Sequence, residues 1–133
     1  MDPEFDQRLS RRVWVIGSDH WPRAYLRAEL IERGYDAVGF VKLAHALAKL
    51  ARSDQPRPAA LVVDVGGQGV TRRQLELVGR KRVPLLLTGG ALDLGAPELA
   101  GARAAAVLQR PVTLGTIADA VERVAPPSGP RSR

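Results

Sequence analysis

The 133-residue sequence has no cysteine and is poor in histidine and aromatic residues. The absence of cysteine excludes disulfides, thiolate metal sites and cysteine nucleophiles. His20 and His45 fall in different expected elements without the spacing of metal ligands, so neither a metal centre nor a histidine base is expected. Two residues each of Trp, Tyr and Phe leave little to stack a flavin, and no nucleophile elbow or Gly-x-x-x-x-Gly-Lys-Ser/Thr loop is present. We therefore expect a protein that is not an enzyme.

Long apolar runs are also missing. No stretch approaches the roughly 20 apolar residues that cross a bilayer, and no charged segment precedes a hydrophobic one as in a signal peptide. These patterns predict a cytoplasmic protein with no membrane partner.

Positive charge is in excess but is not gathered into a nucleic-acid-binding motif. The net charge is +6 with a pI near 10.7. The basic residues are scattered along the expected helices, and neither a helix-turn-helix pattern nor an aromatic-rich strand accompanies them. We interpret them as solvated arginines on amphipathic helices, so nucleic acid is not the expected partner.

The length suits one domain with a single core. Residues 1–10 begin with Met-Asp-Pro-Glu-Phe, which looks like translated cloning-site sequence, and we expect a flexible segment there. Residues 126–133 are rich in proline and read as a disordered tail or linker, which suggests a fragment of a longer protein. The folded domain is expected over residues 11–125.

Short apolar runs alternate with amphipathic segments along this domain, which indicates an α/β fold with one doubly wound parallel sheet of five strands. The ligand-side crevice of such a sheet lies at the carboxyl ends of its strands. Strands are expected at residues 13–16, 37–41, 60–65, 85–87 and 104–108. The helices between them are expected to bury Leu26, Leu30 and Ile31; Leu43, Leu47 and Leu50; Leu75 and Val78; and Leu114, Ile117, Val121 and Val124, with caps at Thr71 and Thr113 and a short or irregular helix over 91–100.

Three local features, in this order and spacing, carry a family resemblance: Gly34-Tyr35 after the first helix, Asp64 near the end of the third strand, and Arg110-Pro111 after the fifth. From Arg12 to Val124 the chain resembles the receiver domain of two-component response regulators, the CheY-like family. The resemblance implies a flavodoxin-like sheet with strand order 2-1-3-4-5.

The resemblance also assigns roles at the crevice. In the family two acidic residues after the first strand hold Mg²⁺ while a phosphoryl group passes to an aspartate on the third strand. The acidic positions correspond to Gly17 and Ser18, so the pair is lost, and Asp19 is either a substitute ligand or an N-cap. Asp64 matches the phosphoacceptor, or else it is a turn partner for the glycines after it.

The remaining positions carry the family's switch. Thr88 corresponds to the switch hydroxyl, or simply ends its strand. Arg110 replaces the family's lysine beside a proline that is often cis, here Pro111, and it could hold Asp64 in one fixed state. The loop 65–69 lacks the family's Met-Pro-Gly pattern, and the fifth strand lacks its aromatic residue. Trp21 is a lid over an unused site, an exposed partner contact or, as we expect, a partly buried packing residue.

These departures favour a degenerate, bacterial pseudo-receiver that signals by protein–protein interaction, without a cofactor and without Mg²⁺-dependent aspartyl phosphorylation. Its expected partner is a signalling protein or a fused output domain, and a homodimer is left open. The expected contact face comprises the fourth and fifth strands, the irregular helix and the last helix. One alternative is a working phosphoacceptor switch at Asp64, with Asp19, Ser18 and water around Mg²⁺; another is a basic nucleic-acid or small-ligand binding module.

Overall fold

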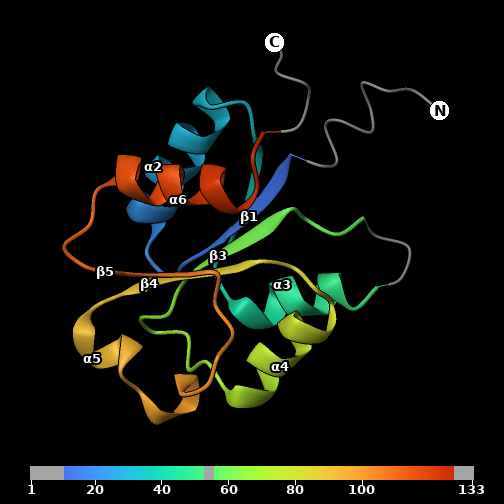
Figure 1. Cartoon of the computed structure of the whole chain (residues 1–133), viewed down its shortest axis with the longest axis vertical. Helices are drawn as coiled ribbons and strands as arrows, with labels where there is room; N and C mark the ends of the chain where they lie inside the picture. The colour runs from blue at the N-terminus through green and yellow to red at the C-terminus, as the bar shows by residue number, and fades with distance from the viewer. Residues whose placement is uncertain (1–10, 53–55, 128–133) are drawn as a thin grey trace.

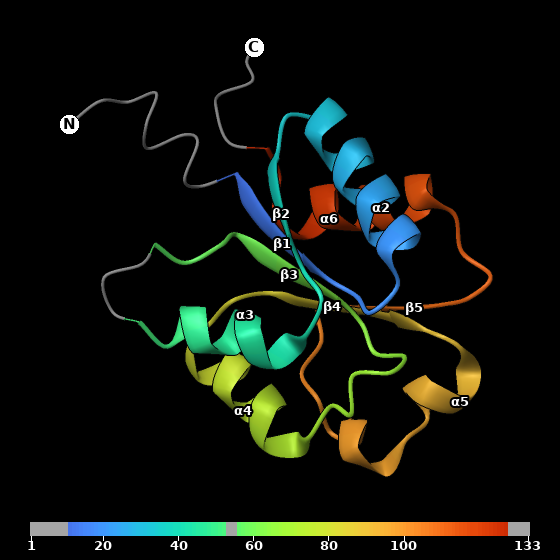
Figure 2. The same cartoon turned by 180° about the vertical axis from the view of Figure 1, so that it is seen from behind.

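The computed structural model describes residues 11–52 and 56–127. Its five strands form one parallel sheet in the order β2-β1-β3-β4-β5, which confirms the expected fold class and strand order. Figures 1 and 2 show helices on both faces of this sheet. The strands are β1 (Arg12–Ile16), β2 (Asp36–Phe40), β3 (Ala60–Asp64), β4 (Leu85–Gly89) and β5 (Ala106–Gln109).

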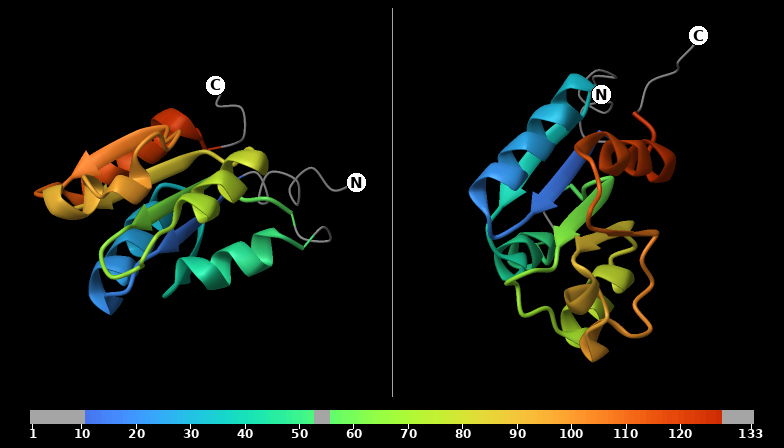
Figure 3. Two further views of the ribbon diagram at one scale, coloured as in Figure 1. Left: turned by 90° about the horizontal axis from the view of Figure 1, so that it is seen from below. Right: turned by 90° about the vertical axis from the view of Figure 1, so that its left-hand side faces the viewer.

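The helices divide into two layers, as the side views in Figure 3 show. One layer holds α2 (His20–Glu32) and α6 (Leu114–Val124). The other holds α3 (Leu43–Leu50), α4 (Arg72–Arg80), α5 (Ala91–Leu94) and the 3-10 turn η1 (Pro97–Leu99). No helix in the described ranges has the length and apolar character of a membrane span.

Each layer covers its own hydrophobic core because alternate residues of a strand point to opposite faces of the sheet. Beneath α2 and α6, Val13, Val15 and Val62 pack with Leu30. The other core, beneath α3 and α4, contains Trp14, Ile16, Leu61, Val63, Leu43 and Leu75. The central strand β3 is therefore apolar on both sides and polar only at Asp64.

Local sequence signals account for the helix ends. Thr71 and Gln74 form a reciprocal capping box at the start of α4, and the Thr113 side chain accepts a hydrogen bond from the Thr116 N–H at the start of α6. Gly34, which follows α2 in the sequence, has φ of +97°. This left-handed conformation suits a glycine that ends a helix, as expected. Both predicted caps are confirmed.

Some sequence expectations need correction. Ile31 is 52% exposed, because Leu26 and Leu30 already supply the buried face of α2. The predicted bounds of all five strands shift by one or two residues: the first begins at Arg12, and the second, third, fourth and fifth end at Phe40, Asp64, Gly89 and Gln109. The segment 91–100 holds one α-helical turn and one 3-10 turn, which confirms an irregular helix. Residues 1–10 and 128–133 of the predicted termini lie outside the described residues.

Candidate functional site

The carboxyl ends of β1, β3 and β4 meet at a small cavity of about 130 Å³. Asp64 and Thr88 are register partners on β3 and β4, so the two side chains are brought to the same edge of the sheet. Gly17 and Asp19 from the loop after β1, and Arg110 from the segment after β5, line the same cavity. The fold therefore brings together most of the residues that the sequence singled out.

Both oxygens of the Asp64 carboxylate have partners. Oδ2 accepts a hydrogen bond from Arg110 Nη1 at 2.8 Å, and Oδ1 accepts one from the Gly66 backbone N–H at 3.2 Å. The turn interpretation of Asp64 and the expected pair with Arg110 are thus both satisfied in one conformation, whereas its role as phosphoacceptor stays a prediction. The side chains of Asp64 and Arg110 are 29% and 47% exposed, so water screens the pair from outside.

The position of Arg110 follows from the sheet edge. Its backbone N–H donates to the Gly89 carbonyl at 2.8 Å, which extends the pairing of β4 and β5 by one bond. The following peptide bond to Pro111 is cis. A guanidinium carries its charge on a planar fork that matches a carboxylate.

The Ser18 hydroxyl is engaged in hydrogen bonds with the loop after β3. Its hydroxyl donates to the Gly66 carbonyl at 3.3 Å and accepts from Gln68 Nε2 at 2.9 Å. Gly17 offers no side chain, and its carbonyl oxygen accepts from Arg23 Nη1 at 2.6 Å. Asp19 stands at the N-cap of α2, but its side chain makes no capping hydrogen bond, so this part of the N-cap interpretation is wrong.

This donor set does not fit the family's Mg²⁺. Mg²⁺ takes oxygen ligands and is usually bound through one or two carboxylates. Of the two cavity carboxylates, Asp64 is bound to Arg110, and Asp19 has neither an acidic neighbour at Ser18 nor one at Gly17. Within residues 11–52 and 56–127, no three acidic or histidine side chains are grouped for a metal ion.

Gln68 is a site residue that the sequence analysis missed. Its Oε1 accepts from the Leu43 N–H at 2.8 Å, and its Nε2 donates to the Val41 carbonyl at 2.8 Å as well as to Ser18. One side chain thereby ties together the loops after β1, β2 and β3. The only signal in the sequence is a long polar side chain within a glycine-rich turn.

Asp93 is a second missed residue. A Cβ atom added to Gly66 would lie 3.4 Å from Asp93 Oδ2 and 3.8 Å from Arg110 Nη2, so the Asp93 carboxylate approaches the crevice from α5.

Thr88 is 5% exposed and is the one buried polar residue in the described part of the chain. The buried hydroxyl thus lies at the crevice where the family resemblance puts its switch residue.

Trp21 is not the packing residue that we expected. Its side chain is 63% exposed, stacks on Tyr25 with 5.7 Å between ring centroids and meets the edge of His20. The ring is therefore held by neighbours on α2 rather than by the core. Trp21 is not among the residues that line the crevice, so it does not cover the cavity either. Its role as an exposed partner contact stays a prediction.

Comparisons with known proteins give one consistent result at the level of structure. No family model and no curated protein sequence matches the chain. Among solved structures, the N-terminal domain of a response regulator/sensory box/GGDEF three-domain protein from Carboxydothermus hydrogenoformans is similar with a TM-score of 0.72 and 12% identity, over 86% of this chain and 93% of that one.

Two further structures agree. A response regulator receiver domain protein from Clostridium thermocellum has a TM-score of 0.70 at 16% identity, over 86% of this chain and 93% of that one. The HemR receiver domain from Leptospira biflexa has a TM-score of 0.68 at 21% identity, over 91% and 98%. At these identities the likeness concerns the fold. The chain therefore has the CheY-like fold of response-regulator receiver domains.

Proposed function

We propose that this chain is a receiver-like signalling domain that acts by binding another protein, without Mg²⁺-dependent phosphorylation of an aspartate. The observation that carries the proposal is the 2.8 Å contact between Arg110 Nη1 and Asp64 Oδ2. The Arg110 guanidinium donates to one carboxylate oxygen of Asp64 and the Gly66 N–H donates to the other, so both possible nucleophilic oxygens are held by hydrogen bonds. The positive charge of Arg110, which would otherwise be available to a bound phosphoryl group, is already paired with the unmodified Asp64 carboxylate.

The loops around Asp64 support a crevice held in one state. Ser18 bonds to the Gly66 carbonyl, and Gln68 joins Ser18 to the start of α3. The Ser18 hydroxyl, which a reduced metal site would use as a ligand, is engaged in two of these hydrogen bonds. A domain fixed in this way presents one constant surface and performs no covalent chemistry of its own.

The proposed partner is a signalling protein or an output domain fused to the chain, in the cytoplasm of a bacterial cell. The similar structure from Carboxydothermus hydrogenoformans is one domain of a three-domain protein, which supports the fused arrangement. The contact face proposed from the sequence contains two exposed apolar side chains, Leu92 at 93% on α5 and Val107 at 57% on β5. In a homodimer formed through this face, the same two side chains would be buried against a second copy of the chain.

A second candidate function is phosphorylation of Asp64 itself. It is favoured by one observation: Asp64, Asp19 and Thr88 line the same cavity at the carboxyl ends of the strands. In this case a carboxylate oxygen of Asp64 would attack the phosphorus of a small donor such as acetyl phosphate, and acetate would leave. Arg110 would first have to release that oxygen.

The two candidates are separated by incubating the full chain with acetyl phosphate and Mg²⁺ and measuring intact mass and oligomeric state. Asp64→Ala is the control for the modified residue. We expect no phosphoryl adduct and an unchanged oligomeric state, because Arg110 holds the nucleophile. An adduct that disappears in Asp64→Ala would overturn the proposal and establish a phosphoacceptor switch.

A further inference from the structure

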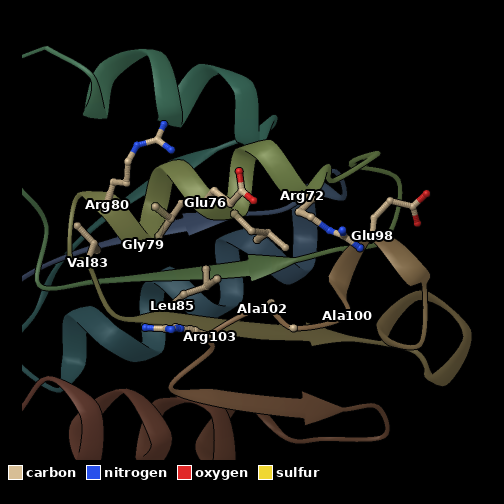
Figure 4. Close-up of a pocket in the computed structure, with 13 residues that line it drawn as sticks. Arg72, Glu76, Gly79, Arg80, Val83, Leu85, Glu98, Ala100, Ala102 and Arg103 are labelled. Atoms are coloured by element: carbon tan, nitrogen blue, oxygen red, sulfur yellow. The ribbon is translucent and has the colours of Figure 1, made fainter.

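A larger groove lies away from the crevice, on the face of the sheet that carries α3 and α4. Figure 4 shows it between α4 and the segment 98–103, with Leu85 of β4 at its base. Its volume is about 460 Å³, within the range of pockets that receive ligands or the anchor side chains of a partner. Leu75, Val78, Val83 and Leu85 give it an apolar floor.

The groove exists because both of its walls, the connection from β4 to β5 and the helix α4, leave part of the sheet uncovered. The connection from β4 to β5 contains only the four-residue α5 and the three-residue η1, so no full helix covers the sheet beside α4. On the opposite wall, Gly79 of α4 has no side chain, and a Cβ added there would meet nothing within 4 Å. The opening is therefore a product of the backbone and not of mobile side chains.

The rim is strongly basic at one end. Arg80 and Arg103 flank the end of the groove near Val83, whereas Arg72 and Glu98 lie together at the other end (Figure 4). Residues 72–82 carry five cationic side chains and one carboxylate, and they account for much of the positive net charge of the chain. An occupant must therefore offer apolar groups to the floor and negative charge to Arg80 and Arg103.

We propose that this groove binds an acidic, amphipathic segment of a partner protein. Its apolar side chains lie over Val83 and Leu85, and its carboxylates pair with Arg80 and Arg103. The inference rests on the proposed function, because it assumes a domain that works by binding proteins. It is independent of Asp64, which lies at the carboxyl edge of the sheet and does not line the groove.

A nucleic acid fits the same groove less well. Phosphates would meet Glu76 and Glu98 at the rim, and bases would find no aromatic ring among the lining residues on which to stack. The exposed pair Trp21 and Tyr25 belongs to α2, which packs on the other face of the sheet. An apolar floor with a basic end suits a peptide that combines hydrophobic and acidic residues.

The test selects binders from a displayed library of short random peptides on the full chain. An enriched peptide is then synthesised, and its affinity is measured at low and at physiological salt. Gly79→Phe fills the groove with a side chain, and the double variant Arg80→Glu/Arg103→Glu reverses the basic end. Gly79→Ala is the matched control, since it adds only a methyl group to the same helix position, and thermal unfolding verifies that each variant is folded.

We expect enriched peptides with apolar residues next to Asp or Glu. Their affinity should fall at least about tenfold in Gly79→Phe and in the double variant, and should be unchanged in Gly79→Ala and Asp64→Ala. Failure to enrich any peptide, enrichment of basic peptides, or full binding to folded Gly79→Phe would overturn the groove proposal. So would a single-stranded oligonucleotide that binds more tightly than the peptide and is excluded by Gly79→Phe. A phosphoryl adduct on Asp64 with intact peptide binding would overturn the proposed function alone.

Discussion

At the scale of single residues, the Asp64–Arg110 pair joins two strand ends that are 46 residues apart in the sequence. Both side chains are partly exposed, so their attraction competes with water and salt. The pair therefore fixes the conformation of the crevice without supplying much of the stability of the fold. A buried ion pair differs in this respect, because removing one of its partners strongly lowers the free energy of unfolding.

The first prediction concerns the strength of this pair. A double-mutant cycle with Arg110→Ala and Asp64→Ala should give a coupling energy of about 0.5–1 kcal/mol in the free energy of unfolding, measured by urea denaturation. The coupling should decrease at high salt. A coupling above about 3 kcal/mol would contradict the exposed geometry and indicate a pair that is shielded from water.

Tyr35 is the residue whose ionisation the fold opposes most clearly. Its side chain is buried, its hydroxyl donates to the Ala125 carbonyl at 2.6 Å, and burial together with the charge of Glu122 raises the pKa of Tyr35 to about 12. In the unfolded chain the phenol has a pKa of about 10. Because the folded-state pKa is the higher one, the stabilisation is complete below pH 10 and is lost as the pH rises through 12.

The second prediction follows from this difference. At neutral pH, Tyr35→Phe should lower the free energy of unfolding by about 1 kcal/mol through loss of the hydrogen bond. Between pH 10 and 12 the wild type should lose stability faster than Tyr35→Phe, so the two curves converge and then cross. Tyr25→Phe removes an exposed phenol and serves as control. Parallel curves for wild type and Tyr35→Phe would contradict the assignment.

At the scale of elements, Gln68 connects three strand-to-helix loops. Its amide satisfies the Leu43 N–H at the start of α3 and reaches Ser18 and Val41. The first N–H groups of a helix have no partner within the helix, so Gln68 acts as a cap supplied from another loop. Gln68 thereby holds the loops after β1, β2 and β3 together at the carboxyl edge of the sheet.

The third prediction is that Gln68→Ala lowers the free energy of unfolding by about 1–2 kcal/mol and speeds hydrogen exchange of the Leu43 amide. Gln74→Ala is the matched control, because it removes a glutamine whose hydrogen bond lies within the α4 capping box. It should leave exchange at Leu43 unchanged. Equal exchange in wild type and Gln68→Ala would show that the connection does not persist in solution.

At the scale of the whole molecule, the two helix layers share one sheet, so they should unfold together. Leu30 belongs to the core beneath α2 and α6, and Leu43 to the core beneath α3 and α4, and both side chains are essentially inaccessible to solvent. The strands between them contribute residues to both cores. Loss of either layer would expose the apolar face of the strands that the other layer needs.

The fourth prediction is that Leu30→Ala and Leu43→Ala each lower the free energy of unfolding by about 2–5 kcal/mol, with one cooperative transition. The measurement combines circular dichroism with fluorescence of Trp14 in a Trp21→Phe background. Ile31→Ala, which truncates an exposed side chain next to Leu30, should cost much less. Transitions that differ between the two probes would show that the layers unfold separately.

The alternation of apolar and amphipathic segments was enough to predict the α/β class, and the motif order around Gly34, Asp64 and Pro111 was enough to predict the strand order. Strand ends moved by one or two residues because pairing with neighbouring strands decides them. Ile31 was assigned to the core because periodicity alone does not measure the width of a buried helix face. The short helix after Gly90 followed from Pro97 and Gly95.

The sequence by itself determined that Gly17 and Ser18 offer no carboxylate after the first strand, because the identity of a residue limits its chemistry wherever it lies. Only the tertiary structure decided that Arg110 reaches Asp64, that Gln68 joins three loops, and that a groove opens beside Gly79. Each of these depends on distances between segments far apart in the chain. Such distances are fixed by the packing of two helix layers on the sheet, and no local pattern encodes them.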